Sequence, residues 1–136
     1  MAVPSNDELI GLAQAVLNPH VVDGRVCGDV ASTLATDAGN QYSGVCIDTA
    51  SGTGFCAEHS AIAAMVTAGE YRIAKIVAVW RADDGVLRVL SPCGRCREFM
   101  QQIDPSNIDA EVVLGRNRSA TLRELLPLTD WSQPVD

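Results

Sequence analysis

Residues 73–80, IAKIVAVW, limit the possible folds of this chain more than any other segment. The run is apolar at nearly every position and is too short to cross a bilayer, which takes about 20 residues. A strand buried on both faces has this pattern, whereas a strand with one wet face alternates apolar and polar residues. We therefore expect a central strand here, covered by helices.

Further strands and helices follow one another along the rest of the chain. The expected strands are 25–36, 41–47, 86–90 and 110–114, and the expected helices are 5–17, 56–70, 94–103 and 122–126. Asp37-Ala38-Gly39-Asn40 is a turn signal that joins the first two strands into a hairpin. This order, without repeats or a linker, predicts one α/β domain over residues 1–136, with helices covering a mixed sheet.

The charge and the start of the chain exclude some classes of function. The net charge is −7, which argues against a polynucleotide partner, although several arginines could still cluster locally. The start MAVPSNDELIGLAQAVL lacks the basic segment of a signal peptide, so we expect a cytoplasmic protein without a membrane anchor. An odd count of five cysteines does not suggest a disulfide framework, which leaves metal ligands, catalytic groups or core residues.

Three of the cysteines stand where helices are expected to begin. Cys56 opens one helix, and Cys93, in SPCGRCRE, opens another with Cys96 one turn later. A helix N-terminus favours thiolate, and residues three apart on a helix point to one side. Three thiolates would leave one position of a tetrahedral zinc open, and Glu58 could move protons beside it. By itself C-x-x-C is also typical of redox pairs and structural zinc sites, and Glu58 could simply stabilise its helix.

The segments Cys56-Ala57-Glu58 and Pro92-Cys93-Gly94-Arg95-Cys96-Arg97 resemble the zinc signature of the cytidine deaminase superfamily. LSPCGRCRE and RELLP are most similar to blasticidin S deaminases and to short, homotetrameric cytidine deaminases. The resemblance covers nearly the whole chain. It implies an α/β/α layered sandwich with a five-stranded mixed sheet, and a homotetramer or homodimer.

The same resemblance implies a role for each residue of the motif. Zn²⁺ would be bound by Cys56, Cys93 and Cys96, with Glu58 as the general acid and base. Water activated at the metal would attack the ring carbon that bears an exocyclic amine, and ammonia would leave. The backbone of Ala57 and Ser91, with the N–H of Cys93, would lie along the edge of the base.

Other positions depart from the pattern of the cytidine deaminases. Cys46 stands where those enzymes have an Asn that holds the ribose, and Asp48 replaces their Glu. A thiol is a poor substitute for a carboxamide in hydrogen-bonding a sugar hydroxyl. His59 stands in place of the usual Arg after C-A-E, so the charge of the thiolates would be offset by helix dipoles, by Arg95 or Arg97, or by a protonated His59.

Several of these residues keep two readings. Cys27 is expected in the core. Cys46 is either a buried strand thiol or a wall of the substrate pocket, and Asp48 either contacts substrate or caps a turn. Trp131 either folds over the pocket, as aromatic tails do in relatives, or packs as an ordinary side chain. Glu98, where a Gln is usual, has no functional reading.

We therefore expect a zinc-dependent hydrolytic deaminase whose partner is a small molecule, most simply a cytosine nucleoside or nucleoside analogue of the cytidine, deoxycytidine or blasticidin S type. One alternative keeps the chemistry and changes the substrate to a free nucleobase or an aminopurine. Another is a catalytically silent module whose zinc site is closed by Cys46 or His59. A polynucleotide editor is a further class, which the charge disfavours.

Overall fold

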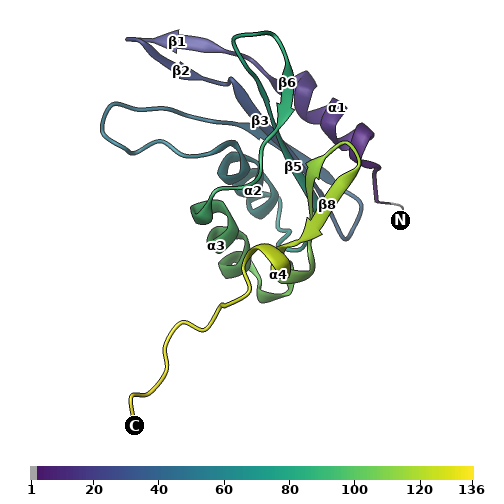
Figure 1. The fold of residues 1–136 in the computed structure, drawn as a ribbon, viewed down its shortest axis with the longest axis vertical. Coiled ribbons are helices and arrows are strands. Elements are labelled where there is room, and N and C mark those ends of the chain that lie inside the picture. The colour runs from purple at the N-terminus through teal and green to yellow at the C-terminus, as the bar shows by residue number, and fades with distance from the viewer. Residues whose placement is uncertain (1–2) are drawn as a thin grey trace.

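The computed structural model describes residues 3–136 as a mixed sheet with helices on both of its faces (Figure 1). The helices are α1 (Asn6–Val16), α2 (Ala57–Thr67), α3 (Gly94–Ile103), α4 (Leu122–Leu125) and the short 3-10 helix η1 (Pro105–Asp109). In the described part of the chain, every helix is too short or too polar to cross a membrane.

The main sheet has the strand order β4-β3-β5-β7-β8, and β6 also pairs with β5. Its strands are β3 (Val30–Thr36), β4 (Gln41–Val45), β5 (Ile73–Arg81), β6 (Leu87–Val89), β7 (Glu111–Gly115) and β8 (Arg118–Thr121). β5 and β7 run parallel, and the other pairs are antiparallel. The expected mixed sheet is confirmed, but the expected number of five strands is wrong because β8 adds a sixth.

The central strand β5 is buried on both faces, as its sequence predicts. Neighbouring side chains on a strand point to opposite faces of the sheet. On one face Val77 and Val113 pack with α1, while on the other Ile76 and Val112 pack with α2 and α3. Two separate cores therefore hold helices to the two faces, which confirms the α/β/α arrangement.

The strand expected over 25–36 is interrupted in the structure. Gly28 has a φ of +79°, and a Cβ there would lie 2.2 Å from the carbonyl oxygen of Asn18. The chain bends at this glycine, which is the residue type that adopts this conformation at least cost. The residues before it form β2 (Arg25–Cys27), which pairs with β1 (His20–Val22) in a separate two-stranded sheet.

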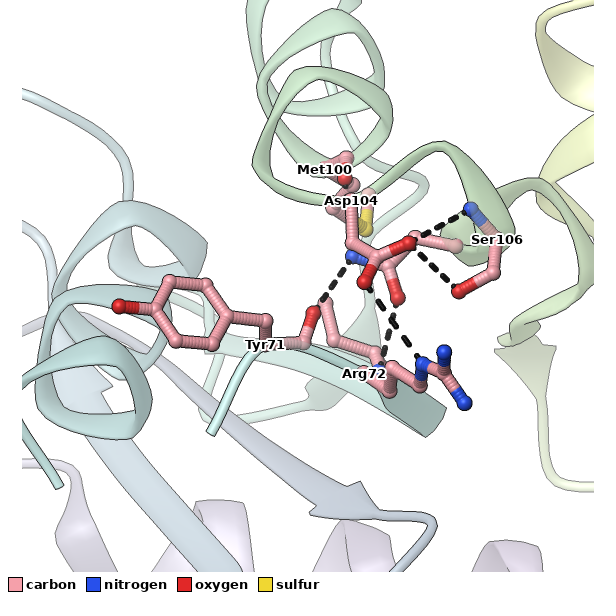
Figure 2. Close-up of polar contacts among 7 residues, drawn as sticks. Tyr71, Arg72, Met100, Asp104 and Ser106 are labelled. Atoms are coloured by element: carbon pink, nitrogen blue, oxygen red, sulfur yellow. Dashed lines mark hydrogen bonds and ion pairs between the residues drawn. The ribbon is translucent and has the colours of Figure 1, made fainter. Parts of the chain in front are cut away.

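Asn107 in η1 links α3 to the start of β5. It is 1% exposed, and its side-chain oxygen accepts a hydrogen bond from the backbone N–H of Ile73 at 2.8 Å. Its side-chain nitrogen donates to the carbonyls of Tyr71 at 3.0 Å and Met100 at 2.9 Å. Figure 2 labels Tyr71 and Met100, the two residues whose carbonyls accept these bonds. This buried amide fixes the end of α3 against the sheet.

Asp104 closes the turn between α3 and η1. Its carboxylate accepts hydrogen bonds from the backbone N–H and the hydroxyl of Ser106, at 2.9 and 2.7 Å, and lies 3.7 Å from the guanidinium of Arg72 (Figure 2). Together with Asn107 it sets the position of α3, the helix that carries Cys96.

Candidate metal centre and active site

Three cysteine sulfurs meet at the point where α2 and α3 begin. Cys56 is the residue before α2, Cys93 is the residue before α3, and Cys96 lies in the first turn of α3. The Sγ of Cys93 is 3.5 Å from that of Cys56 and 3.4 Å from that of Cys96, and all three atoms lie within 4.8 Å of one another. Thiolates bound to tetrahedral zinc at about 2.3 Å lie roughly 3.8 Å apart. The donor set therefore fits zinc.

The surroundings of the three thiols differ. Burial raises the pKa of the Cys96 thiol, and the Glu58 carboxylate adds to the rise. Burial acts in the same direction at Cys93, but hydrogen bonds from the backbone N–H groups of Cys96 and Arg95 and from the neighbouring thiols outweigh it, so its pKa lies below the ordinary value. A cation among the sulfurs favours the thiolate at all three, because the ligand form of cysteine is the deprotonated one.

Glu58 lies beside this cluster in the first turn of α2. Its side chain is only 5% exposed, and burial raises the pKa of its carboxyl above the usual value, although hydrogen bonds to its own N–H and to Cys96 oppose the rise. A raised carboxyl pKa is a shift in the direction that general acid–base catalysis near neutral pH requires. This environment suits the acid–base role that the sequence predicts for Glu58.

A cavity of about 170 Å³ adjoins the sulfurs and Glu58. Its walls are Val30, Cys46, Cys56, Ala57, Glu58, Ala78, Leu90, Ser91 and Cys93. Among the expected substrate contacts, Cys46, Ala57 and Ser91 therefore line the same space as the metal ligands. Val30, Ala78 and Leu90 form its apolar walls, which suits a flat heterocyclic ring.

Two other expected substrate contacts lie outside these walls. The backbone N–H of Asp48 is 3.4 Å from the Sγ of Cys27, and that thiol is 3.7 Å from the carbonyl of Asp48. Cys27 was expected in the core but is only half-buried, and it contacts the backbone of Asp48, three residues beyond β4, instead. Trp131 is 84% exposed, in the extended segment that follows α4 and runs away from the sheet (Figure 1). Contact of Asp48 or Trp131 with substrate stays a prediction.

Asp29 also lies in this region. The Cys46 thiol donates a hydrogen bond to its Oδ1 at 3.1 Å, so a carboxylate supports one wall of the cavity. Asp29 lies just before β3 and Cys46 just after β4, 17 positions apart. The pairing of β3 with β4 brings them together; the sequence predicted this hairpin but not its register.

The arginines near the cluster donate hydrogen bonds mainly to backbone carbonyls. Arg97 donates to the carbonyls of Pro92 and Leu125, at 2.8 and 3.0 Å, and to the hydroxyl of Ser91 at 3.0 Å. It therefore braces the loop that carries Ser91, and its part in offsetting the thiolate charge stays a prediction. Arg95 reaches the carbonyl of Gly54 at 3.5 Å.

His59 contacts the sulfur cluster through Cys96. Its Nδ1 lies 3.5 Å from the Sγ of Cys96, and the residue is 8% exposed. Burial lowers the pKa of its imidazole, and the nearby charge of Arg95 lowers it further. A protonated His59, one of the sequence-based expectations for charge balance, stays a prediction.

Comparison with known proteins places these residues in a family. The model of the cytidine and deoxycytidylate deaminase zinc-binding region matches residues 8–112, a range that includes all three cysteines and Glu58. The chain belongs to the cytidine deaminase family. It is accordingly a hydrolytic deaminase with a zinc cofactor, as its sequence predicts.

Relatives of this deaminase extend the match to most of the chain. It is 35% identical over 104 residues to the blasticidin-S deaminase of Bacillus cereus, which covers 73% of this chain and 74% of the relative. The cytidine deaminase of Mycobacterium leprae superposes with a TM-score of 0.73 at 26% identity, covering 90% of this chain and 97% of that one. The Mycobacterium tuberculosis enzyme gives 0.71 at 28% identity, covering 89% and 93%.

Proposed function

We propose that this deaminase removes the exocyclic amine from the cytosine ring of a small nucleoside or nucleoside analogue and releases ammonia. The observation that carries the proposal is the buried carboxylate of Glu58 beside three sulfurs at the wall of a cavity of about 170 Å³. The relatives include a blasticidin-S deaminase and a cytidine deaminase, which supports a cytosine-containing substrate.

In the proposed mechanism, Cys56, Cys93 and Cys96 would hold the zinc, which when bound would supply the Lewis-acid chemistry that makes water a nucleophile at neutral pH. Glu58 takes the proton released by that water and passes it to the leaving amine. The oxygen of water becomes bonded to the ring carbon, the bond from that carbon to the exocyclic nitrogen breaks, and ammonia leaves. The backbones of Ala57, Ser91 and Cys93 would orient the edge of the base.

The contacts of the two candidate closing residues, Cys46 and His59, support a site with three protein ligands. The thiol of Cys46 is directed to Asp29, and the Nδ1 of His59 approaches Cys96, outside the group of three sulfurs. These contacts support an open fourth position for water. X-ray absorption at the zinc edge should show three sulfurs and one oxygen, whereas an imidazole or a fourth sulfur would favour the silent module.

A free nucleobase or an aminopurine is a second candidate substrate. Cys46 lines the cavity where the cytidine deaminases carry a ribose-binding Asn, and a cavity of about 170 Å³ holds little more than a ring. This observation motivates testing bases beside nucleosides.

A substrate screen tests the proposal. Zinc-loaded protein is assayed for ammonia release with cytidine, deoxycytidine, blasticidin S, cytosine, adenine and guanine, and Cys93→Ser serves as a zinc-deficient control. We expect the zinc-loaded wild-type protein, but not Cys93→Ser, to release ammonia from a cytosine nucleoside or analogue. Turnover of free bases alone would replace the first candidate by the second, and ammonia release by the control at the wild-type rate would contradict both.

We also propose that the enzyme works in the cytoplasm on a small-molecule substrate. All five cysteines lie in the described residues and none forms a disulfide, which supports a reducing compartment.

A further inference from the structure

His59 connects the two helices that carry the metal ligands. It lies three residues after Cys56, and its backbone N–H donates to the carbonyl of Cys56 at 3.0 Å. Its ring reaches across to α3, where Nδ1 lies 3.5 Å from the Sγ of Cys96. The imidazole is thus attached to one ligand through the backbone and meets a second through its ring nitrogen.

Phe99 fixes the plane of this imidazole. The two rings stack with their centroids 4.2 Å apart and their planes 6° from parallel. Phe99 lies three residues after Cys96, on the same side of α3. Phe55 approaches the imidazole from another direction, at 6.1 Å between centroids. A ring held in this way cannot swing away from the sulfur without losing its stacking partner.

The direction of the hydrogen bond follows from the chemistry of the two atoms. Cysteine binds metal as the thiolate, which has no proton and is an acceptor. The Nδ1 of His59 must therefore carry a proton if it is to interact favourably with Cys96 in the loaded protein. A neutral imidazole with its proton on Nδ1 meets this requirement without a further charge.

We propose that His59 is a positioning residue of the zinc site, whose Nδ1–H donates a hydrogen bond to the Cys96 thiolate and draws off part of the charge of the three sulfurs. It acts through Cys96 and does not contact the substrate. The inference rests on the zinc site of the proposed function, but metal affinity is measured without substrate. Its failure is therefore distinguishable from failure of the deaminase proposal.

Residues that orient or hydrogen-bond metal ligands typically contribute 10- to 100-fold to metal affinity. The test compares His59→Phe, which keeps an aromatic ring against Phe99 but has no donor, with His59→Asn, whose amide nitrogen lies close to the position of Nδ1. Zinc dissociation constants are measured by chelator competition, and the thiolate-to-metal charge-transfer band is recorded with Co²⁺. His20→Phe, at the other histidine of the chain, is the matched control.

We expect His59→Phe to weaken zinc binding by about 10- to 100-fold. We also expect it to shift the Co²⁺ charge-transfer band to longer wavelength, because a metal-bound thiolate without this hydrogen bond gives up electron density more readily. His59→Asn should recover most of the affinity and the band position, and His20→Phe should match the wild type. If the space occupied by the His59 ring does not accept Phe, His59→Leu and His59→Asn form a pair of similar shape that differs in the hydrogen-bond donor.

Two results would overturn the proposal. Wild-type affinity and spectrum in both His59→Phe and His59→Leu would show that the donor contributes nothing to the site. Loss of the tetrahedral Co²⁺ ligand-field bands in those variants, without recovery in His59→Asn, would instead make His59 a metal ligand.

Discussion

At the scale of single residues, the chemistry of this deaminase depends on how closely its groups are packed. Glu58 stays close to Cys56 and Cys96 because all three lie in or beside the first turns of α2 and α3. The sequence predicted this much, since spacing within one helical turn fixes which side chains share a face. The contact of Asp29 with Cys46 and the stacking of Phe99 on His59 were not predicted, because each joins separate elements.

Cys46→Asn tests whether this wall of the cavity meets a sugar. An amide there offers both a donor and an acceptor to a ribose hydroxyl, and a net hydrogen bond contributes about 1 kcal/mol. We expect the ratio of kcat/KM for cytidine over cytosine to rise roughly fivefold, in line with that energy. Steady-state ammonia release measures the ratio, and Cys27→Ser is the control. An unchanged ratio would place the sugar elsewhere.

Asp84 gives a pH prediction at a site remote from catalysis. Hydrogen bonds from the Arg88 guanidinium and from the backbone N–H of Val86 lower the pKa of its carboxyl to about 2. A lowered pKa contributes stability above the unfolded value, and this contribution is lost as the pH falls toward about 2. A carbon-detected NMR titration should place its midpoint near 2, and Arg88→Gln should raise it. A midpoint near 3.8, the ordinary value, would show that the pair does not form in solution.

At the scale of elements, the site depends on how tightly α2 lies against the sheet. Gly44 on β4 is where the two meet, since a Cβ there would lie 2.3 Å from the Cβ of Ser60 and 2.5 Å from the backbone nitrogen of Ala61. Ser60 also donates to the carbonyl of Val45 at 2.8 Å. The sequence predicted the hairpin and the helix, but it could not show that one glycine sets the distance between them.

Gly44→Ala should therefore destabilise the protein by about 1–3 kcal/mol, the usual cost of adding a methyl group to a packed contact. It should also lower activity, because α2 carries Glu58. Gly11→Ala is the control: that glycine lies in α1 with no atom within 4 Å of its added Cβ, so stability should rise by about 0.5–1 kcal/mol. Denaturant unfolding measures both, and a Gly44→Ala midpoint equal to that of the wild type would refute the close contact.

The strands differ in how clearly their sequences predicted them. β5 was clear because both of its faces are apolar, whereas β8, Arg118–Thr121, is an edge strand with two exposed and two half-buried residues. Its sequence RSAT has no apolar alternation, so only its pairing with β7 identifies it. Edge strands of this kind are fixed by tertiary contacts more than by their own residues.

At the scale of the whole molecule, large apolar side chains remain exposed at several places, among them β1 and the C-terminal segment. Val21 and Val22 on β1 are 65% and 40% exposed, and Leu128 and Trp131 in the C-terminal segment are 85% and 84% exposed. Exposed apolar groups of this kind often mark contacts between chains. We propose that the protein is a homotetramer or a homodimer, as its resemblance to short cytidine deaminases implies.

Light scattering after gel filtration should therefore give a mass of four, or two, chains of 14.4 kDa. Truncation after Pro127 removes Leu128 and Trp131 and should shift the mass toward smaller species if the segment joins chains. Chromatography of both proteins at matched concentrations is the control for dilution. A monomeric mass for the intact protein across the micromolar range would contradict the proposal.

The most direct test of proton transfer by Glu58 compares wild-type enzyme with Glu58→Gln at equal zinc content. Glutamine keeps the shape of the side chain but cannot carry the proton from water to the leaving amine. We expect Glu58→Gln to bind zinc at the wild-type level, as verified by metal analysis. We expect its kcat for ammonia release to fall by at least about 100-fold. Wild-type turnover in zinc-loaded Glu58→Gln would contradict this role of Glu58.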